Sequence, residues 1–252
     1  MKRGTRSRRG RGAGGRSPGG RRGRGAGGGS LRGRRARRRG SRAPVISDLT
    51  AQRLSIYLRC LDDLGKGGVE TVSSQHLAER FSLNSAQIRK DLACFGEFGV
   101  RGVGYVVSDL KRNLTRILGL VKNRKVVIVG AGNLGMALAD YGGFNREGFS
   151  IAALLDNDPR KVGRASRGGV PILDVGTLPS LARRERVSIA VLAVPAQVAQ
   201  ETLDWVTRSG IRAVLNFAPT RLRARPGVTL KVVDLKIQLE NLAFHLARAR
   251  GA

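Results

Sequence analysis

Apolar residues in the first half of the chain recur at helical spacing and predict three helices. The first spans about 49–64, with Ser47 or Asp48 as its N-terminal cap. Its apolar face consists of Leu54, Tyr57, Leu58 and Leu61. Two shorter helices are predicted at 73–81 and at about 85–95. Short helices joined by a tight turn are typical of a helix-turn-helix.

The junction between the two short helices carries the expected cap chemistry. Ser73 or Ser74 can cap the first of them, and Ser82-Leu83-Asn84 forms a three-residue turn with Asn84 as the cap of the second. Four glycines are then interleaved with valines and Tyr105 over residues 95–107, which predicts a hairpin. A further helix is expected over about 109–121.

From Lys125 the pattern changes to alternating strands and helices. The unbroken apolar run KVVIVG is typical of a buried parallel strand, and four later segments are strand candidates: FSIAALLD, VSIAVLAVP, IRAVLNFAP and VTLKVVD. Helices are expected near 134–141, 175–185 and 196–208. This order predicts an α/β domain with a doubly wound parallel sheet of the Rossmann type. A leucine stripe predicts a last helix over 235–250.

The charge of the chain is distributed very unevenly. Residues 1–44 hold 17 of the 47 Lys and Arg residues and none of the 18 acids, so the other 208 residues carry a net charge of +12. A segment of Gly and Arg has almost nothing to bury, and we expect it to be disordered. It is either a nucleic-acid-binding tail or translated upstream sequence without a selected role. The remaining basic charge still favours a polyanionic partner.

The predicted helix-turn-helix offers a DNA-reading surface. On its second helix Ile88, Leu92 and Phe95 share the apolar face, so the polar side chains project outward. Amide and cationic groups at that end of a helix read base edges and phosphates in the major groove. The candidate DNA contacts are Ser85, Gln87, Arg89 and Lys90 on the helix and Arg101 on the hairpin, which would be a wing. The alternative is a small helical domain with a solvated basic face.

A dinucleotide fingerprint follows the first predicted strand of the second half. The motif G-x-G-x-x-G opens a helix directly after KVVIV, and it comprises Gly130, Ala131, Gly132, Asn133, Leu134 and Gly135. Gly130 permits the tight turn, Gly132 admits the pyrophosphate, and Gly135 allows close helix–strand packing. The helix N-terminus supplies N–H donors for phosphate. The alternative is that the glycines serve packing alone.

An acid stands where a ribose partner is expected. Asp156 ends the second strand, 26 residues after Gly130 and 21 after Gly135. An acid at this place binds the adenine ribose hydroxyls and favours NAD over NADP, although Arg160 and Lys161 are close enough to weaken the rejection of NADP.

Several classes of protein are disfavoured by the composition. Hydride transfer to a carbonyl needs a proton donor, but 193–197 and 216–219 contain no His, Lys, Asp or Glu. We therefore expect no enzyme and no catalytic residues. The two histidines and two cysteines show no metal-ligand spacing, so no metal is expected. The absence of a long apolar run and of a secretory h-region favours a cytoplasmic protein without a membrane span.

The chain resembles the Rex family of redox-sensing transcriptional repressors over about residues 45–250. The motifs that carry the resemblance occur in the family's order: NSAQIRKDLACFGEFGVRGVGY, VVIVGAGNLGMALADY, DNDPRKVG, GGVPI, AVPAQVAQ and LNFAP. The resemblance implies a homodimer that binds double-stranded operator DNA when NADH is low. NADH would then release the DNA, whereas NAD+ would support the DNA-bound form. Arg89, Lys90 and Arg101 would contact DNA.

The resemblance also implies a redox switch and a swapped helix. Arg59, Tyr141 and Asp234 match a family triad whose pairing changes with redox state. The C-terminal helix would be exchanged across the dimer. One departure is Leu235, where some members have a Phe that inserts towards the partner's nicotinamide. Leucine fills space but cannot stack, so the preference for NADH over NAD+ is the property most open to change.

The predicted organisation has four parts: a disordered tail (1–44), a winged-helix DNA-binding domain (45–123), a Rossmann NAD(H)-binding domain (124–234) and a C-terminal dimerisation helix (235–252). Two rival functions remain. One is an NAD-dependent oxidoreductase with a basic extension, which would turn over NADH with a small carbonyl substrate. The other is a constitutive DNA-binding protein whose Rossmann unit only dimerises, which would bind no NADH.

Overall fold

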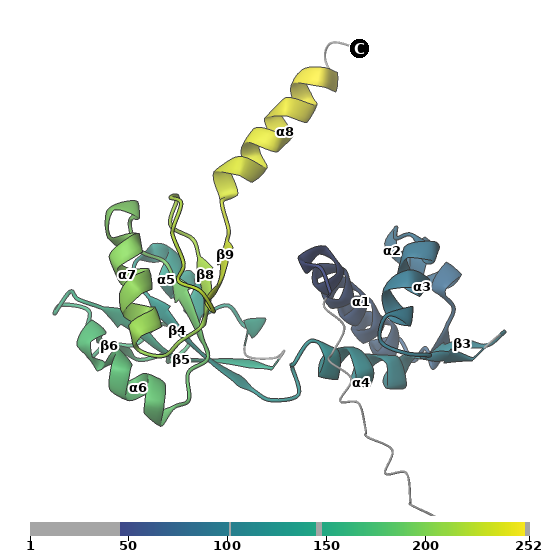
Figure 1. Cartoon of the computed structure of the whole chain (residues 1–252), viewed down its shortest axis with the longest axis horizontal. Helices are drawn as coiled ribbons and strands as arrows, with labels where there is room; N and C mark the ends of the chain where they lie inside the picture. The colour runs from purple at the N-terminus through teal and green to yellow at the C-terminus, as the bar shows by residue number, and fades with distance from the viewer. Residues whose placement is uncertain (1–45, 101, 145–147, 250–252) are drawn as a thin grey trace, which may run out of the picture. The chain divides into compact units, whose positions relative to one another are not determined.

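The structure is a computed structural model that describes residues 46–100, 102–144 and 148–249. Its helices are α1 (Asp48–Lys66), α2 (Ser74–Phe81), α3 (Ser85–Ala93), α4 (Val107–Ile117), α5 (Asn133–Ala139), α6 (Leu178–Arg184), α7 (Ala196–Arg208) and α8 (Leu235–Ala249) (Figure 1). Its strands are β1 (Thr71–Val72), β2 (Gly99–Val100), β3 (Gly104–Val106), β4 (Arg124–Val129), β5 (Phe149–Asp156), β6 (Ile172–Asp174), β7 (Ile189–Leu192), β8 (Ala213–Asn216) and β9 (Thr229–Val232).

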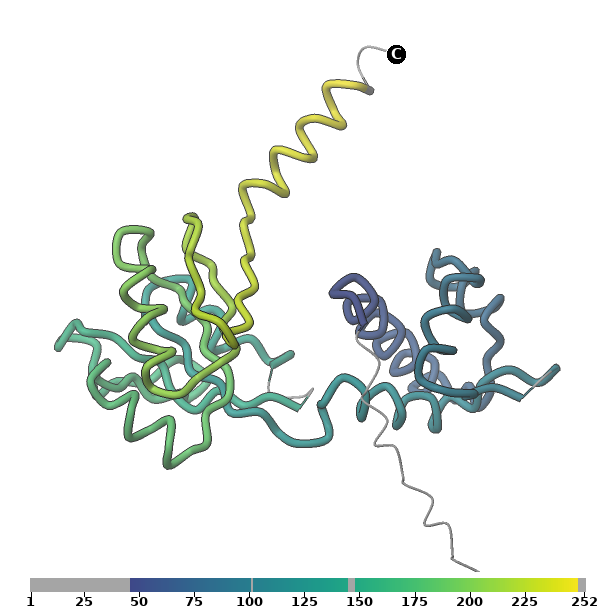
Figure 2. The backbone as a smooth tube through the Cα atoms, viewed as in Figure 1, coloured from purple at the N-terminus to yellow at the C-terminus, as the bar shows by residue number. Residues whose placement is uncertain are grey.

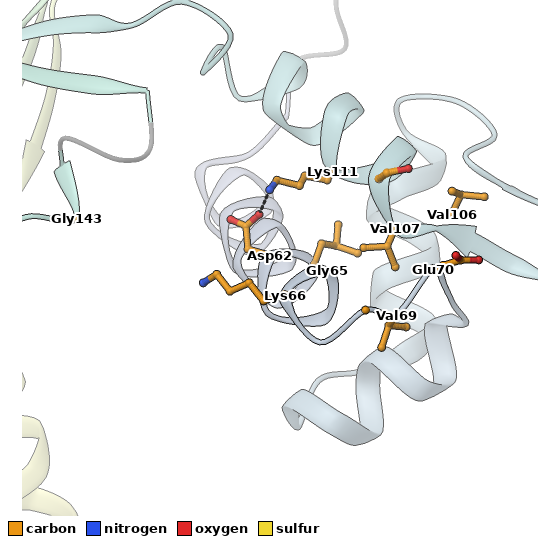
Figure 3. Close-up of a pocket in the computed structure, with 12 residues that line it drawn as sticks. Asp62, Gly65, Lys66, Val69, Glu70, Val106, Val107, Lys111 and Gly143 are labelled. Carbon is orange, nitrogen blue, oxygen red and sulfur yellow. Dashed lines mark ion pairs between the residues drawn. The ribbon is translucent and has the colours of Figure 1, made fainter.

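The first half of the described chain is a winged helix-turn-helix. Apolar side chains of α1, α2, α3 and α4 form one core, with Leu54, Leu77, Ile88 and Leu114 fully buried. The lysine of α4 at position 111 points toward Asp62 of α1, and the two side chains form an ion pair at 2.5 Å (Figure 3). The apolar faces of the four helices meet in this one core.

The caps predicted from the sequence are confirmed. Ser47, Ser73 and Asn84 each accept a hydrogen bond from the backbone N–H three residues later, at the start of α1, α2 and α3 respectively. Ser82 ends α2 in the left-handed conformation, with φ of 52°. This conformation makes the sharp turn between the two short helices, and the N–H of Leu83 bonds back to the carbonyl of Ala78.

The wing is a three-stranded antiparallel sheet in the order β1-β3-β2. Figure 2 traces the backbone from α3 through this hairpin into α4. A Cβ at Gly104, where φ is +98°, would lie 2.6 Å from the carbonyl oxygen of Val72, so only glycine lets the two strands approach this closely. The helix expected at 85–95 ends at Ala93, and the one expected at 109–121 spans 107–117, because Gly119 at φ +72° turns the chain.

The second half is a six-stranded sheet in the order β6-β5-β4-β7-β8-β9, and every neighbouring pair is parallel. The strand order reverses between β4 and β7, so their carboxyl ends form the crevice in which doubly wound folds bind ligands. The predicted α/β class is confirmed. The strand β6 was not predicted, because three residues are too few to show a strand pattern.

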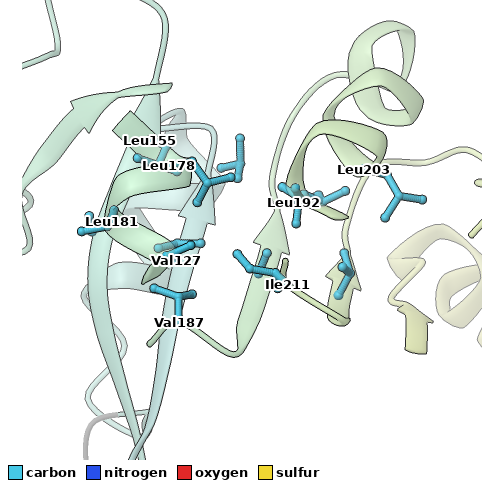
Figure 4. Packing of buried hydrophobic residues seen from close by; sticks show 14 residues of the cluster. Val127, Leu155, Leu178, Leu181, Val187, Leu192, Leu203 and Ile211 are labelled. Atoms are coloured by element: carbon cyan, nitrogen blue, oxygen red, sulfur yellow. The ribbon is translucent and has the colours of Figure 1, made fainter. Parts of the chain in front are cut away.

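Alternate side chains of the central strands fill two cores on opposite faces of this sheet. Val127, Leu155 and Leu192 pack against α6 and α7, as Figure 4 shows with Leu178, Leu181 and Leu203. On the other face Val126, Ile128 and Leu154 pack with residues of α5. Covering both faces explains why these strands are apolar at nearly every position.

The last helix, α8, has no such burial. Its large apolar side chains are 54–66% exposed: Leu235, Ile237, Leu239, Leu242, Phe244 and Leu246. Exposed apolar surface of this extent is typical of an interaction site. Across the described segments, no helix is both long and apolar enough to span a membrane.

Candidate DNA-reading surface and dinucleotide pocket

Two cations on α3 lie where the sequence predicted DNA contacts. Arg89 and Lys90 are exposed. The Arg89 guanidinium donates a hydrogen bond of 3.0 Å to the hydroxyl of Ser74, the first residue of α2. A cavity of about 660 Å³ lies between α3, the start of α2 and the wing, and Arg89 lines it. A cation beside a helix N-terminus favours an anion such as a DNA phosphate.

The other predicted contacts differ in their placement. Ser85 is half-buried at the first position of α3. Gln87 is also half-buried, and its amide nitrogen donates 2.8 Å to the carboxylate of Asp91. The outward projection predicted for Gln87 is therefore met only in part, because an acid one turn away draws the side chain inward. Arg101 lies outside the described residues.

Asp91 is the centre of a polar cluster that sequence reasoning missed. Its side chain is almost closed to solvent, yet it accepts two hydrogen bonds from Arg53, at 2.6 and 2.7 Å, and one of 2.9 Å from the hydroxyl of Tyr57. The Arg53 hydrogen bonds, opposed by burial and supported by Gln87 and Tyr57, hold the pKa of Asp91 below its usual value. Burial and the bond to Asp91 raise the pKa of Tyr57 to about 12. The one available sign was an acid on the apolar face of a basic helix.

Gly130 and Gly135 have the structural roles that the fingerprint predicts for them. Gly130 has φ of +104°, and a Cβ there would lie 2.4 Å from the carbonyl oxygen of Ala193. A Cβ at Gly135 would lie 1.8 Å from the carbonyl oxygen of Gly130, so α5 can approach β4 only with glycine at this position. A Cβ at Gly132 would meet nothing within 4 Å. Gly132 caps α5 without a side-chain hydrogen bond, which leaves backbone donors open towards a ligand.

A cavity of about 620 Å³ lies at the carboxyl ends of β4, β5 and β7. Its lining includes Gly130, Gly132 and Asp156, the predicted pyrophosphate and ribose positions, and also Pro195 and Trp205. Its location coincides with the reversal of strand order, and its size suits a dinucleotide. Asn133 and Leu134 are exposed at the first two positions of α5, while Ala131 is buried.

Asp156, the predicted ribose partner, accepts hydrogen bonds from two backbone N–H groups and from Lys161. Its Oδ2 accepts a hydrogen bond of 2.8 Å from the N–H of Ala131 and one of 3.0 Å from Lys161, and its Oδ1 accepts one of 2.9 Å from the N–H of Asp158. Burial alone would raise the pKa of Asp156, but these hydrogen bonds outweigh it and lower the pKa. The residue is therefore a carboxylate. Lys161 also lines the cavity, and Arg160 pairs with Asp158 instead.

The cavity contains an acid that does not come from a strand end. Glu201 lies on α7 and lines the cavity. The strand-end segments themselves supply Ala193, Val194 and Pro195 to the lining, none of which transfers a proton. Asn216 is buried and caps its own loop through hydrogen bonds of 3.0 Å with both backbone groups of Ala218.

Comparison with known proteins shows which families have similar sequences. Residues 45–93 match the family model "Putative DNA-binding protein N-terminus", and residues 121–220 match the model "CoA binding domain". The redox-sensing transcriptional repressor Rex of Desulfitobacterium hafniense is 45% identical over 206 residues, which cover 82% of this chain and 98% of that protein. Rex of Streptomyces coelicolor is also 45% identical, over 85% of this chain and 83% of that protein.

The chain belongs to the Rex family of redox-sensing transcriptional repressors. Solved structures agree with this assignment. RSP, a Rex-family repressor, was crystallised with NAD+ and operator DNA; that chain is 38% identical to this one, with a TM-score of 0.78 over 82% of this chain and 95% of that chain. RSP crystallised with NADH matches with a TM-score of 0.73 and 37% identity, over 82% and 97% of the two chains.

The three residues predicted to form a redox switch, Arg59, Tyr141 and Asp234, lie on different parts of the chain. Arg59 is exposed on α1, and Tyr141, two residues after the end of α5, is 59% exposed with its ring edge against Phe144. Asp234 accepts hydrogen bonds from the N–H groups of Lys236 and Ile237, at 2.9 and 3.3 Å, and so caps α8. This capping role was not foreseen, although an Asp before a leucine-periodic segment is a recognisable helix start.

The two cysteines differ in their exposure. Cys60 is buried in the core of the winged helix, and Cys94 is exposed after α3. In the part of the chain that the structure describes, no three His, Cys, Asp or Glu side chains are grouped so as to hold a metal ion.

Proposed function

We propose that this chain represses transcription by binding operator DNA through α3 when NADH is scarce, and that NADH binding at the Rossmann crevice releases the DNA. One observation carries the proposal: a winged helix with exposed cations and a dinucleotide cavity occur in one chain of the Rex family. RSP, a Rex-family repressor that shares this fold, was crystallised with operator DNA and NAD+ and also with NADH.

The cofactor would be held mainly by backbone. The pyrophosphate would lie over the turn from Gly130 to Gly135, where Gly132 leaves open space. Asp156 would take the adenine ribose hydroxyls, and its full carboxylate charge would disfavour the 2′-phosphate of NADP. Lys161 is close enough to Asp156 to reduce that discrimination.

The DNA would be contacted by α3 and the wing. Arg89 and Lys90 supply exposed cations for the phosphates or guanine edges, and Ser85 and Gln87 lie at the N-terminal end of the same helix, which enters the major groove in proteins of this class. Arg101 would add a wing contact. These assignments follow from helix position and side-chain chemistry.

We infer that the functional unit is a homodimer. The exposed apolar side chains of α8 support this, because a second copy can cover them. A two-fold dimer reads two half-sites spaced by about 34–36 Å or a multiple, so a change in dimer geometry alters DNA affinity.

The energetics of such a switch are attainable. Oxidised nicotinamide is cationic and reduced nicotinamide is neutral, so a cavity that desolvates the ring favours NADH. Moving a dimer from 1:99 to 99:1 needs roughly 5.5 kcal/mol of differential binding, and two NADH molecules that bind independently would each supply half of it.

The chain would act as a regulator without catalysing a reaction, in the cytoplasm where DNA and the nicotinamide pool are both available. The named relatives are transcriptional repressors, which supports this. Glu201 in the cavity is the one observation that favours an oxidoreductase instead, because it is an acid beside the expected cofactor. Sustained NADH oxidation with small carbonyl compounds would support that alternative.

Direct ligand titration tests the proposal. NADH fluorescence with the full chain should show saturable binding, while NADPH and coenzyme A, included because of the CoA-binding family model, should bind much more weakly. A random pool of DNA duplexes should yield a palindromic site that the protein selects without NADH and not with it. Failure to bind NADH, or selection that ignores NADH, would contradict the proposal.

A further inference from the structure

The contact between α1 and α3 contains a buried charge whose hydrogen bonds can be followed individually. Asp91 of α3 is 3% exposed, and its two carboxylate oxygens accept four hydrogen bonds from three side chains. Arg53 binds both oxygens, Tyr57 binds Oδ2, and Gln87 binds Oδ1. Arg53 and Tyr57 lie on α1, whereas Gln87 lies one turn before Asp91 on α3 itself.

Burying a carboxylate is costly unless its oxygens are bonded, and an apolar residue would pack the two helices at lower cost. Holding α3 against α1 does not require Gln87, because Arg53 and Tyr57 already bind the acid. The bond from Gln87 to Asp91 lies within α3, so it fixes the side chain of Gln87 on the DNA-reading helix. Asp91 therefore orients the side chain of Gln87 as well as joining the two helices.

The chemistry of the bond fixes which way the amide faces. An ionised carboxylate only accepts hydrogen bonds, so it binds the NH2 group of Gln87, and the opposite orientation would place Oε1 against the carboxylate charge. One N–H is then committed to Asp91. The second N–H and Oε1 are left for DNA. A donor and an acceptor side by side match N7 and the N6 amino group of adenine in the major groove.

We propose that Asp91 is a positioning residue that locks the amide of Gln87, so that Gln87 reads adenine. The inference rests on the proposed DNA-binding function and specifies one DNA base that the protein would recognise. Arg53 keeps Asp91 ionised and in place, so the cluster transmits the position of α1 to one reading side chain. Without the bond to Asp91, the amide of Gln87 could rotate freely, and a freely rotating amide discriminates less between bases.

The test is a double-mutant cycle on DNA specificity with the full chain. Wild-type protein first selects a duplex from a random pool, and affinities are then measured for all single-base variants of that site. Gln87→Ala should remove a preference for adenine of about tenfold or more at one position of each half-site. Asp91→Asn should reduce the same preference at the same position. The double variant should then behave like Gln87→Ala, because the two residues act through one contact.

Tyr57→Phe is the matched control. It removes a hydrogen bond from the same carboxylate but leaves the bond to Gln87, so it should lower stability while base preference stays as in wild type. If Asp91→Asn does not fold, Arg53→Lys takes its place. Lysine keeps the charge without the two-point grip, and about a threefold loss of the adenine preference is expected.

The outcomes separate the inference from the proposed function. If no duplex is selected, both fall together. If a duplex is selected but Asp91→Asn, or Arg53→Lys in its place, weakens all base variants equally, Asp91 is only structural and the inference is overturned. A preference at Gln87 that is not for adenine, or effects that add in the cycle, would overturn it as well.

Discussion

The DNA-reading domain and the dinucleotide domain each contain an aspartate almost closed to solvent, and the partners of the two differ. Asp91 is bound by the side chains of Arg53, Tyr57 and Gln87. Asp156 is bound by two backbone N–H groups and by Lys161. In the DNA-binding domain the buried acid is thus held by side chains from distant positions in the sequence. In the cofactor crevice it is held mainly by backbone groups near the glycine turn.

This difference predicts how each region responds to substitution. A backbone-built crevice tolerates almost no added atom where the chain approaches itself, so its failures should be failures of folding. A side-chain-built reader can lose a contact and keep its fold, so its failures should appear in DNA affinity and specificity. The substitutions below test that contrast, starting with the largest expected effect.

Gly135→Ala should be the most damaging change. The new Cβ would lie 1.8 Å from the Gly130 carbonyl oxygen, so α5 must move away from β4. We expect a loss of about 3 kcal/mol in the free energy of unfolding, and no NADH binding. Urea unfolding and NADH fluorescence measure both. Gly132→Ala is the control: it meets nothing within 4 Å, so it should keep stability within about 0.5 kcal/mol while weakening NADH binding. Equal effects from the two variants would refute the backbone account.

Asp91→Ala should lower the stability of the DNA-binding domain by about 2 kcal/mol at pH 7, because Arg53 and Tyr57 lose their common acceptor. Arg53 is only partly exposed, so water replaces only part of the lost hydrogen bonding. NADH affinity should not change. Urea unfolding monitored on the winged helix, beside NADH fluorescence, separates the two effects. A parallel loss of NADH affinity would contradict the separation between the regions.

The same variant gives a pH dependence with a defined sign. Asp91 has its pKa lowered in the folded protein, first by Arg53, so its ionised form stabilises the fold above the ordinary value of 3.8. As pH falls through the lowered folded pKa, this stabilisation is lost. The wild-type protein should therefore exceed Asp91→Ala in stability at pH 7, and the difference should shrink below about pH 4. A constant difference down to pH 2 would show that the charge of Asp91 is unimportant.

Arg89→Ala should affect DNA and leave the fold intact. Losing one phosphate or base contact is expected to cost about 1–3 kcal/mol of operator affinity, and a phosphate contact would also reduce the salt slope by about one. Arg208→Ala removes the same charge from the exposed end of α7 and serves as the control. Anisotropy titrations at several salt concentrations compare them. If both variants bind DNA equally well, Arg89 does not lie in the interface.

Leu235→Phe should produce the smallest effect. The side chain is 62% exposed at the start of α8, so stability should change by less than about 0.5 kcal/mol. A ring that reaches the nicotinamide from this position, as the family resemblance implies for Phe here, should favour NADH over NAD+ by about 1 kcal/mol. Leu239→Phe on the same exposed helix is the control. Competition of NAD+ against NADH fluorescence measures the ratio, and no difference between the two variants would exclude a role for position 235.

Local chemistry predicted much of this structure. Ser47, Ser73 and Asn84 were identifiable as caps because a short polar side chain before an apolar period satisfies free N–H groups. Gly130 and Gly135 were predictable because the fingerprint demands a turn and a close approach.

The missed features depend on tertiary structure. Asp91 finds Arg53 and Tyr57 at sequence separations of 38 and 34 residues, which no local pattern reveals. Glu201 reaches the cavity from α7, away from the strand ends where acids were sought. The strand β6 has only three residues, so its parallel pairing with β5 leaves no recognisable strand pattern in the sequence.

The central claim is that NADH, and not NAD+, dissociates this protein from its operator. The most direct measurement is fluorescence anisotropy of a preformed complex between the full chain and its selected duplex, titrated at fixed total nicotinamide across NADH:NAD+ ratios. The same titration without residues 1–44 shows what the basic tail contributes. Dissociation that follows the NADH fraction in both proteins is the predicted result; a complex that stays bound at every ratio, or that NAD+ dissociates equally well, would contradict the account.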